Sequence, residues 1–259
     1  MASTVLAAQL YTLRDFTKTP ADMAVTFKKV KALGYDAVQV SAIGPIAKPE
    51  LRKLLDDTGL QCVATHVGFN ELRDETARVI EEHQILGCKH TAIGGIPNEY
   101  KSEDGYKKFA KEGSAVGEKL SKGGLSFSYH NHSFELERYG KKNALEILIE
   151  ESDPKFLGFE IDTYWIQHGG GDPAAYIRRV KGRIPLLHLK DMVAIKPPDK
   201  WVDIVMAEVG EGNLNWPEIL KAAKESGVQW YIVEQDTCRR DPFESLGISL
   251  KNLKSWGMQ

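Results

Sequence analysis

The chain has 259 residues, of which 42% are hydrophobic and 27% charged, so it can bury one large core or two small ones. Its formal net charge of −2 supplies no general attraction to nucleic acid or anionic lipid, and we expect no nucleic-acid partner. No apolar run is long enough to span a membrane, and residues 1–10 do not resemble a secretion signal, so we expect no membrane partner and a cytoplasmic location.

Eight short apolar runs predict β-strands, because each is rich in aliphatic or aromatic residues and is bounded by turn or helix signals. In chain order they are Val5 to Gln9, Ala37 to Ser41, Cys62 to Val67, Thr91 to Ile96, Ser126 to His130, Leu157 to Asp162, Pro185 to Lys190 and Tyr231 to Gln235. An amphipathic stretch and a glycine precede five of these runs, at Gly34, Gly59, Gly87, Gly124 and Gly227. Glycine just past a helix end turns the chain back, so these positions predict helix-to-strand junctions.

Helix starts are indicated by capping side chains before proline. They are Thr19-Pro20, Asp153-Pro154, Asp172-Pro173 and Asp241-Pro242, together with Asn215 and Glu218 around Pro217. Strands that alternate with helices and are apolar on both faces predict parallel βα units. An open doubly wound sheet is the alternative, but no glycine-rich dinucleotide loop follows the first strand. We therefore predict an α/β fold, a single (β/α)8 TIM barrel that forms one domain over residues 1–259.

Polar residues at the ends of four predicted strands indicate a metal site. In a barrel the carboxyl ends of all strands meet on one face. Asp162, His188 and Glu234 end or follow three runs, and Glu135 lies in the turn after a fourth. Three carboxylates and one imidazole favour Mn, Mg or Co, while Zn is also compatible. Such a site would stabilise an enediolate as a proton leaves the carbon next to a carbonyl group.

The stretches YHNHSFEL, GFEIDTYWIQHGGGDP, IPLLHLKD and IVEQD resemble the xylose-isomerase-like TIM-barrel family of sugar phosphate isomerases and epimerases. Inosose dehydratase and ketose 3-epimerases belong to that family, as does, more distantly, endonuclease IV. The resemblance extends from QLYTLRD near the N-terminus through the last predicted strand. It implies a sugar substrate and a metal held by one acidic residue, one Asp, one His and one Glu after the fifth to eighth strands. Asp162, His188 and Glu234 match these positions.

The chain departs from the family pattern at two positions. Ketose epimerases have a Glu within the fifth strand where this chain has His130, so either Glu135 or His130 supplies that ligand. We favour Glu135 as ligand and His130 as general base or substrate contact, with Glu135 and Glu234 also catalytic. Trp165 stands where related epimerases have a substrate-binding His, and its indole offers a flat wall against a sugar ring.

Further substrate contacts are expected from Lys190, which the resemblance supports, and from His66 on the third strand.

The leading hypothesis is a metal-dependent sugar isomerase or epimerase that works through an enediolate. The alternative is a lyase or dehydratase acting on a keto-sugar or keto-glycoside. An abasic-site endonuclease would need a basic surface, which the net charge of −2 disfavours. A non-catalytic sugar-binding barrel would lack metal affinity, and a homo-oligomer is compatible with the sequence.

Overall fold

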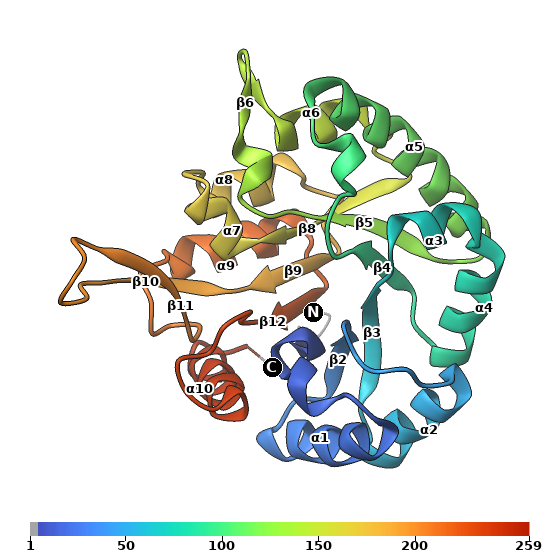
Figure 1. The fold of residues 1–259 in the computed structure, drawn as a ribbon, viewed down its shortest axis with the longest axis vertical. Coiled ribbons are helices and arrows are strands. Elements are labelled where there is room, and N and C mark those ends of the chain that lie inside the picture. The colour runs from blue at the N-terminus through green and yellow to red at the C-terminus, as the bar shows by residue number, and fades with distance from the viewer. Residues whose placement is uncertain (1–4, 259) are drawn as a thin grey trace.

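Eight parallel strands close into a barrel in the computed structural model, which describes residues 5–258 (Figure 1). Around the barrel their order is β1 (Val5–Gln9), β12 (Trp230–Val233), β9 (Leu186–Leu189), β8 (Leu157–Asp162), β5 (Ser126–His130), β4 (His90–Ile93), β3 (Gln61–His66) and β2 (Ala37–Val40). Every predicted run overlaps one of these strands, although several ends differ by a few residues. The predicted (β/α)8 barrel is therefore confirmed.

Helices cover the outside of the barrel (Figure 1). They are α1 (Pro20–Leu33), α2 (Lys48–Thr58), α3 (Phe69–Asp74), α4 (Thr76–Leu86), α5 (Glu103–Lys122), α6 (Ala144–Glu151), α7 (Thr163–His168), α8 (Pro173–Arg179), α9 (Trp216–Ser226) and α10 (Pro242–Ser255). Within residues 5–258, no helix is both long and apolar enough to cross a membrane. Three single-turn or short 3-10 segments, Leu10–Phe16, Asn98–Tyr100 and Phe134–Leu136, follow strand ends or precede helices.

The predicted helix caps are confirmed with one exception. Thr19 and Asp22 form a reciprocal capping box at the start of α1, and Asp172, Asn215 and Asp241 cap α8, α9 and α10. The prediction at Asp153 was wrong, because the chain turns there directly into β8. The Asp153 carboxylate accepts a hydrogen bond from the backbone N–H of Lys155 (2.8 Å), which closes a turn instead of starting a helix.

Strand alternation explains why polar side chains gather inside one end of the barrel. Ala7, Ala37, Ala64, Leu186 and Ile232 form an apolar cluster inside the barrel. Residues two apart on a strand share a face, so the side chains two positions further along also point inward. Those residues are Gln9, Gln39, His66, His188 and Glu234. The barrel interior therefore changes from apolar to polar toward the carboxyl ends of its strands.

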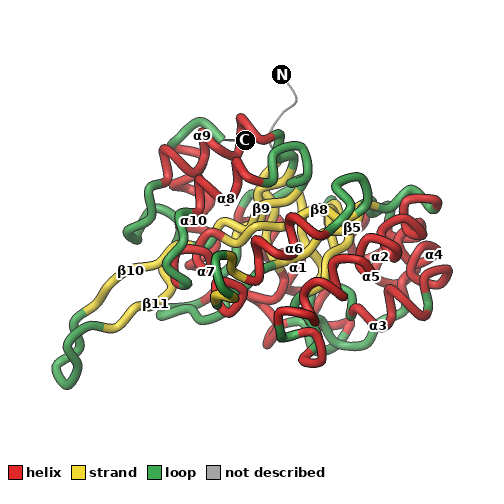
Figure 2. Tube along the Cα trace, turned by 90° about the horizontal axis from the view of Figure 1, so that it is seen from above, coloured by secondary structure: helices red, strands yellow, loops and turns green. Residues whose placement is uncertain are grey.

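Two antiparallel hairpins were missing from the sequence predictions. β6 (Arg138–Tyr139) pairs with β7 (Lys142–Asn143), and β10 (Asp191–Ile195) pairs with β11 (Asp203–Ala207). The second hairpin extends away from the barrel (Figure 2). This hairpin begins directly after Lys190, so its first strand starts next to the predicted site.

Candidate active site

Four side chains from neighbouring strands converge at the carboxyl end of the barrel. His130 ends β5, Asp162 ends β8, His188 lies on β9, and Glu234 follows β12. One candidate ligand atom from each lies within 4.8 Å of the other three. The Nδ1 atom of His188 lies 2.9 Å from Oε2 of Glu234 and 3.8 Å from Oδ2 of Asp162. The barrel therefore brings together three of the predicted ligands, Asp162, His188 and Glu234, with His130 as the fourth group. We call these four residues the strand-end cluster.

The atoms that face one another in this cluster have no hydrogen-bond partner beyond their close ionic contacts with one another and with Lys190. Among the described residues, they are Nδ1 of His130, Oδ2 of Asp162, Nδ1 of His188 and Oε2 of Glu234, all buried. A buried polar atom without a partner is costly, and native proteins rarely leave one. Here four such atoms lie within a few ångströms of one another. All are imidazole nitrogens or carboxylate oxygens, which are common ligands of divalent cations. The residues present therefore fit a metal ion.

Lys190 places a positive charge at the edge of the cluster. Its side chain is fully buried, and its Nζ lies 3.0 Å from Asp162 Oδ2, 2.9 Å from Glu234 Oε2 and 2.8 Å from Asp236 Oδ2. Burial alone would lower the pKa of Lys190, but these carboxylates raise it above its usual range. In turn, Lys190 and His188 outweigh burial and hold the pKa of Glu234 well below its usual range. Glu234 is therefore ionised at neutral pH.

Glu135 does not lie with the strand-end cluster. Its buried carboxylate accepts hydrogen bonds from the Tyr129 hydroxyl (2.7 Å) and from the backbone N–H of His132 (2.8 Å). Tyr129 and His130 are consecutive on β5, so their side chains point to opposite faces of the strand. Glu135 thus joins the side of β5 that faces away from the barrel interior. This position leaves His130 as the fifth-strand group beside the other three candidate ligands.

Burial raises the pKa of Glu135 to about 7 from an ordinary value of 4.5, so its ionisation should cost stability. The unfolded chain releases this proton at lower pH than the folded chain, and stability therefore falls as pH rises through about 4.5 to 7. Glu135→Gln lacks this proton. Between pH 4.5 and 8, the unfolding free energy of the variant relative to the parent chain should rise by on the order of 3 kcal/mol. Urea denaturation in EDTA measures the unfolding free energy of both proteins at each pH. If the difference between them does not change with pH, the raised pKa of Glu135 is wrong.

Beneath the strand-end cluster lies a fully buried hydrogen-bonded network. Glu160 on β8 accepts from Gln39 Nε2 (2.8 Å) and from His66 Nε2 (2.7 Å). Gln39 Oε1 lies 2.7 Å from both Gln9 Nε2 and His188 Nε2. Sequence reasoning placed Glu160 on the same strand face as Asp162 but assigned no role to it or to Gln39. Gln39 and Glu160 could have been recognised from the sequence, because each is a polar residue at an inward-facing position of an otherwise apolar strand.

A small cavity opens over the strand-end cluster. It has a volume of about 150 Å³ and is lined by Tyr11, Ser41, Ala42, His66, Gly94, His130, His132, Glu234 and Asp236. Burial, with the charge of neighbouring His188 next, lowers the pKa of His130 well below its usual range, and burial lowers the pKa of His132 to about 4. These two imidazoles are therefore neutral at pH 7. The predicted substrate contact His66 lies on this cavity.

Trp165 lies beside the cavity rather than on its wall. Its backbone N–H donates to Asp162 Oδ1 (2.9 Å), because Asp162 caps α7. The indole ring packs 5.4 Å from the ring of His132 and 5.5 Å from Lys190 Nζ. Its buried Nε1 has no hydrogen-bond partner within residues 5–258. The predicted flat surface is present, with one unused donor, next to the predicted substrate contact Lys190.

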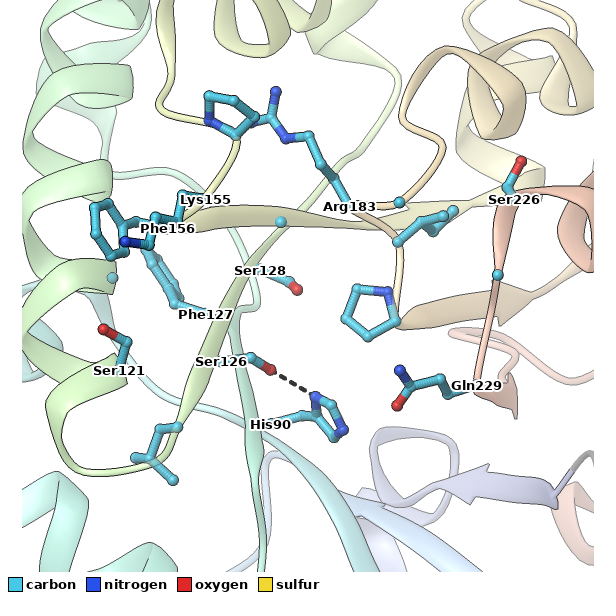
Figure 3. Close-up of a pocket in the computed structure, with 18 residues that line it drawn as sticks. His90, Ser121, Ser126, Phe127, Ser128, Lys155, Phe156, Arg183, Ser226 and Gln229 are labelled. Carbon is cyan, nitrogen blue, oxygen red and sulfur yellow. Dashed lines mark hydrogen bonds between the residues drawn. The ribbon is translucent and has the colours of Figure 1, made fainter. Parts of the chain in front are cut away.

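A larger cavity of about 340 Å³ lies at the opposite end of the barrel. Figure 3 shows His90, Ser126, Ser128 and Gln229 around it, and these residues stand near the starts of strands. His90 Nδ1 is hydrogen-bonded to Ser126 Oγ at 2.6 Å. None of the predicted site residues lines this cavity. TIM barrels carry their chemistry at the carboxyl ends of the strands, so the smaller cavity is the candidate active site.

Comparisons with known proteins agree with the barrel. The family model described as xylose isomerase-like TIM barrel matches residues 27–256. An inosose dehydratase of Clostridium tetani (strain Massachusetts / E88) is 26% identical over 190 residues, which cover 67% of this chain and 62% of that protein. The match thus spans less than two thirds of the length of this curated relative. Several other curated relatives, from Bacillus and Geobacillus, are also inosose dehydratases.

Solved structures show the same fold. A sugar phosphate isomerase/epimerase from Parabacteroides distasonis ATCC 8503 is 25% identical, with a TM-score of 0.81 over 98% of this chain and 95% of that one. A xylose isomerase-like TIM barrel protein from Mycobacterium smegmatis in complex with magnesium is 14% identical, with a TM-score of 0.75 over 98% of both chains. The relatives thus include enzymes named for isomerisation or epimerisation and enzymes named for dehydration.

Proposed function

The chain belongs to the xylose isomerase-like TIM barrel family, and on that basis we propose that it is a metal-dependent enzyme that moves a proton next to the carbonyl group of a sugar. The observation that carries the proposal is the strand-end cluster, in which four buried carboxylate and imidazole groups face one another beside Lys190 and under a cavity. Three of these residues stand where the sequence pattern placed metal ligands. The fourth is His130 instead of Glu135.

His130, Asp162, His188 and Glu234 would hold the metal ion. Two carboxylates and two imidazoles make a more nitrogen-rich set than three carboxylates and one imidazole, which favours Mn, Co or Zn over Mg. A divalent cation bound there would stabilise negative charge that develops on a substrate oxygen. His130 then serves as a ligand, and the role of proton acceptor passes to Glu234.

Glu234 is suited to accept a proton from carbon. It lines the cavity, and Lys190 keeps it ionised at neutral pH. A carboxylate next to a low-dielectric cavity can take the proton as the substrate carbonyl gains charge. His66 lines the cavity and is placed to bind a substrate oxygen, whereas Lys190 does not line it and pairs with Asp162 and Glu234. These residues together would bind a hydroxyketone, remove one proton and keep the developing charge stable.

The first candidate reaction is isomerisation or epimerisation, in which a proton returns to carbon. It is supported by the fold relative named as a sugar phosphate isomerase/epimerase and by two proton-transfer groups, Glu234 and His66, on one small cavity. The second candidate is a lyase reaction, in which the same enolate expels water or an alcohol from the next carbon. The curated relatives named inosose dehydratase support this second candidate.

Incubation in deuterated water separates the two reactions. The Mn²⁺-loaded protein is mixed with a panel of ketoses, inososes and 3-keto-glycosides, and products are followed by NMR and mass spectrometry. Deuterium next to the carbonyl group with a changed stereocentre, and no eliminated product, indicates an isomerase or epimerase. Release of water or an alcohol with formation of an unsaturated ketone indicates a lyase. No exchange with any ketone, while Mn²⁺ is bound, would contradict proton transfer at this site.

A further inference from the structure

We propose that Glu160 is a positioning residue that sets which nitrogen His188 and His66 present to the active site. The inference rests on the proposed metal function of the strand-end cluster, but Glu160 itself is outside that cluster. Its carboxylate is completely buried inside the barrel, below His130 and His188. Buried metal ligands commonly depend on such partners, because the second ring nitrogen of a ligating histidine needs a defined acceptor.

The argument starts from the acceptor-only nature of a carboxylate. Glu160 Oε2 lies 2.7 Å from His66 Nε2, and Oε1 lies 2.8 Å from Gln39 Nε2. An ionised carboxylate offers no hydrogen, so both of these nitrogens must donate. Each Glu160 oxygen has a side-chain N–H group within hydrogen-bond distance, which is the pattern of a carboxylate that acts as acceptor only. Glu160 therefore fixes the orientation of the Gln39 amide as well as the hydrogen on His66.

Gln39 transmits this orientation to His188. With its Nε2 committed to Glu160, the Gln39 side chain presents Oε1 to its other neighbours. That oxygen lies 2.7 Å from His188 Nε2, and Glu160 Oε1 lies 3.3 Å from the same nitrogen. Both neighbours are acceptors, so Nε2 of His188 carries a hydrogen. When a metal ion takes the place of the second ring proton, Nδ1 supplies the lone pair that binds it.

This nitrogen is the one that faces the strand-end cluster. His188 Nδ1 lies 2.9 Å from Glu234 Oε2 and 3.8 Å from Asp162 Oδ2. A cation that replaced the proton on Nδ1 would be bound by this nitrogen and both carboxylates together, an arrangement that the opposite tautomer could not provide. Glu160 and Gln39 thus prepare His188 to bind metal before the metal arrives.

The same carboxylate prepares His66. Because Glu160 holds the hydrogen on His66 Nε2, it assigns the acceptor role to Nδ1, which lies 3.2 Å from the Ser41 hydroxyl. Ser41 and His66 both line the cavity over the cluster. A substrate hydroxyl that takes the place of the Ser41 hydroxyl would meet a nitrogen acceptor. Glu160 therefore links the metal side of the site to its substrate side.

The hydrogen bonds also distinguish two candidate metal clusters. His66, His130, Glu160 and His188 have ligand atoms as close together as those of the strand-end cluster. In that set, however, the Glu160 oxygens and the facing nitrogens of His66 and His188 already pair with one another or with Gln39. These four residues therefore support the strand-end cluster and do not form a second metal site. A single metal ion per chain is expected.

Glu160→Gln tests the inference, since glutamine offers one acceptor oxygen and one NH₂ group where the carboxylate had two acceptors. Isothermal titration with Mn²⁺ should show affinity weakened by about 10- to 100-fold. Nitrogen NMR of ¹⁵N-histidine-labelled protein loaded with ¹¹³Cd²⁺ should show cadmium coupling to Nδ1 of His188 in the parent chain. In the variant that coupling should be lost or divided between the two nitrogens.

Glu208→Gln is the matched control, because Glu208 is also buried and accepts a hydrogen bond from Ser245 Oγ (2.7 Å) on α10. It should leave Mn²⁺ affinity and the cadmium coupling unchanged. If Glu160→Gln fails to fold, Gln39→Met removes the nearer of the two acceptors of His188 while leaving the pair between His66 and Glu160. It should weaken Mn²⁺ binding and leave the nitrogen shifts of His66 unchanged.

The outcomes are separable from those of the proposed function. If the parent chain binds no Mn²⁺ or Cd²⁺, the proposed metal site fails and this inference fails with it. If the parent chain binds Mn²⁺, and the folded Glu160→Gln or Gln39→Met variant binds it equally well with the same cadmium coupling to Nδ1, the positioning role is wrong while the metal site stands.

Discussion

Replacement of Glu234 by glutamine is expected to slow proton exchange at the substrate carbon by about 10³-fold. Glutamine keeps the size of the side chain but cannot accept a proton and is a weaker metal donor. The partners of Glu234 make the change severe, since its Oε2 lies 2.9 Å from both Lys190 Nζ and His188 Nδ1. Exchange is measured in deuterated water with the most reactive ketone of the panel, at saturating Mn²⁺, so that metal occupancy does not limit the rate.

Glu208→Gln serves as the control for this experiment too, because it is a buried glutamate away from the cluster that should exchange at the parent rate. If Glu234→Gln exchanged as fast as the control, another group would be the proton acceptor. His66 would then be the first residue to test, since it lies on the same cavity.

Lys190→Met is expected to lower the free energy of unfolding by about 3–5 kcal/mol, measured by urea denaturation in EDTA at pH 7. Methionine has a similar volume but no charge, and it would leave Asp162, Glu234 and Asp236 facing one another. The three carboxylates now lie within 3.0 Å of the Lys190 ammonium, and the lysine is completely buried. Removing one partner from such a group leaves uncompensated buried charge, which is costly.

Mn²⁺ should recover part of the stability lost in Lys190→Met, because a cation that binds only the folded chain stabilises it in proportion to its affinity. Exposed Lys181 provides the control, and Lys181→Met should change the unfolding free energy little. A surface ion pair contributes about 1 kcal/mol to stability. If Lys190→Met lowers the unfolding free energy by less than this, Lys190 does not neutralise these carboxylates.

The barrel and most of the cluster were accessible from sequence because they follow local rules. Glycine marks a helix end by its conformational freedom, and four of the five predicted junction glycines, Gly34, Gly59, Gly87 and Gly227, cap helices at positive φ. Asp162 and His188 lie on strands, where alternation fixes the direction of a side chain. Once the strands were placed, inward-pointing residues at their carboxyl ends followed.

The remaining features depend on information that no local pattern carries. Glu135 comes after the end of β5, where alternation no longer applies, and Tyr129 draws its carboxylate to the opposite side of the strand. The network of Gln9, Gln39 and Glu160 joins the paired strands β1 and β2 to β8, which comes near them only through the closed barrel. The β10–β11 hairpin has no glycine turn signal between its strands, where Pro197 and Pro198 lie instead. The extent of the domain and the oligomeric state stay predictions.

Metal analysis of the purified protein tests the central claim most directly. After dialysis against Mn²⁺ and removal of free ions, the parent chain should retain a single divalent ion per chain. Asp162→Ala and Glu234→Ala each remove one carboxylate of the strand-end cluster and should lose that ion, while circular dichroism shows that both remain folded. Full retention of the metal in both variants would contradict the site.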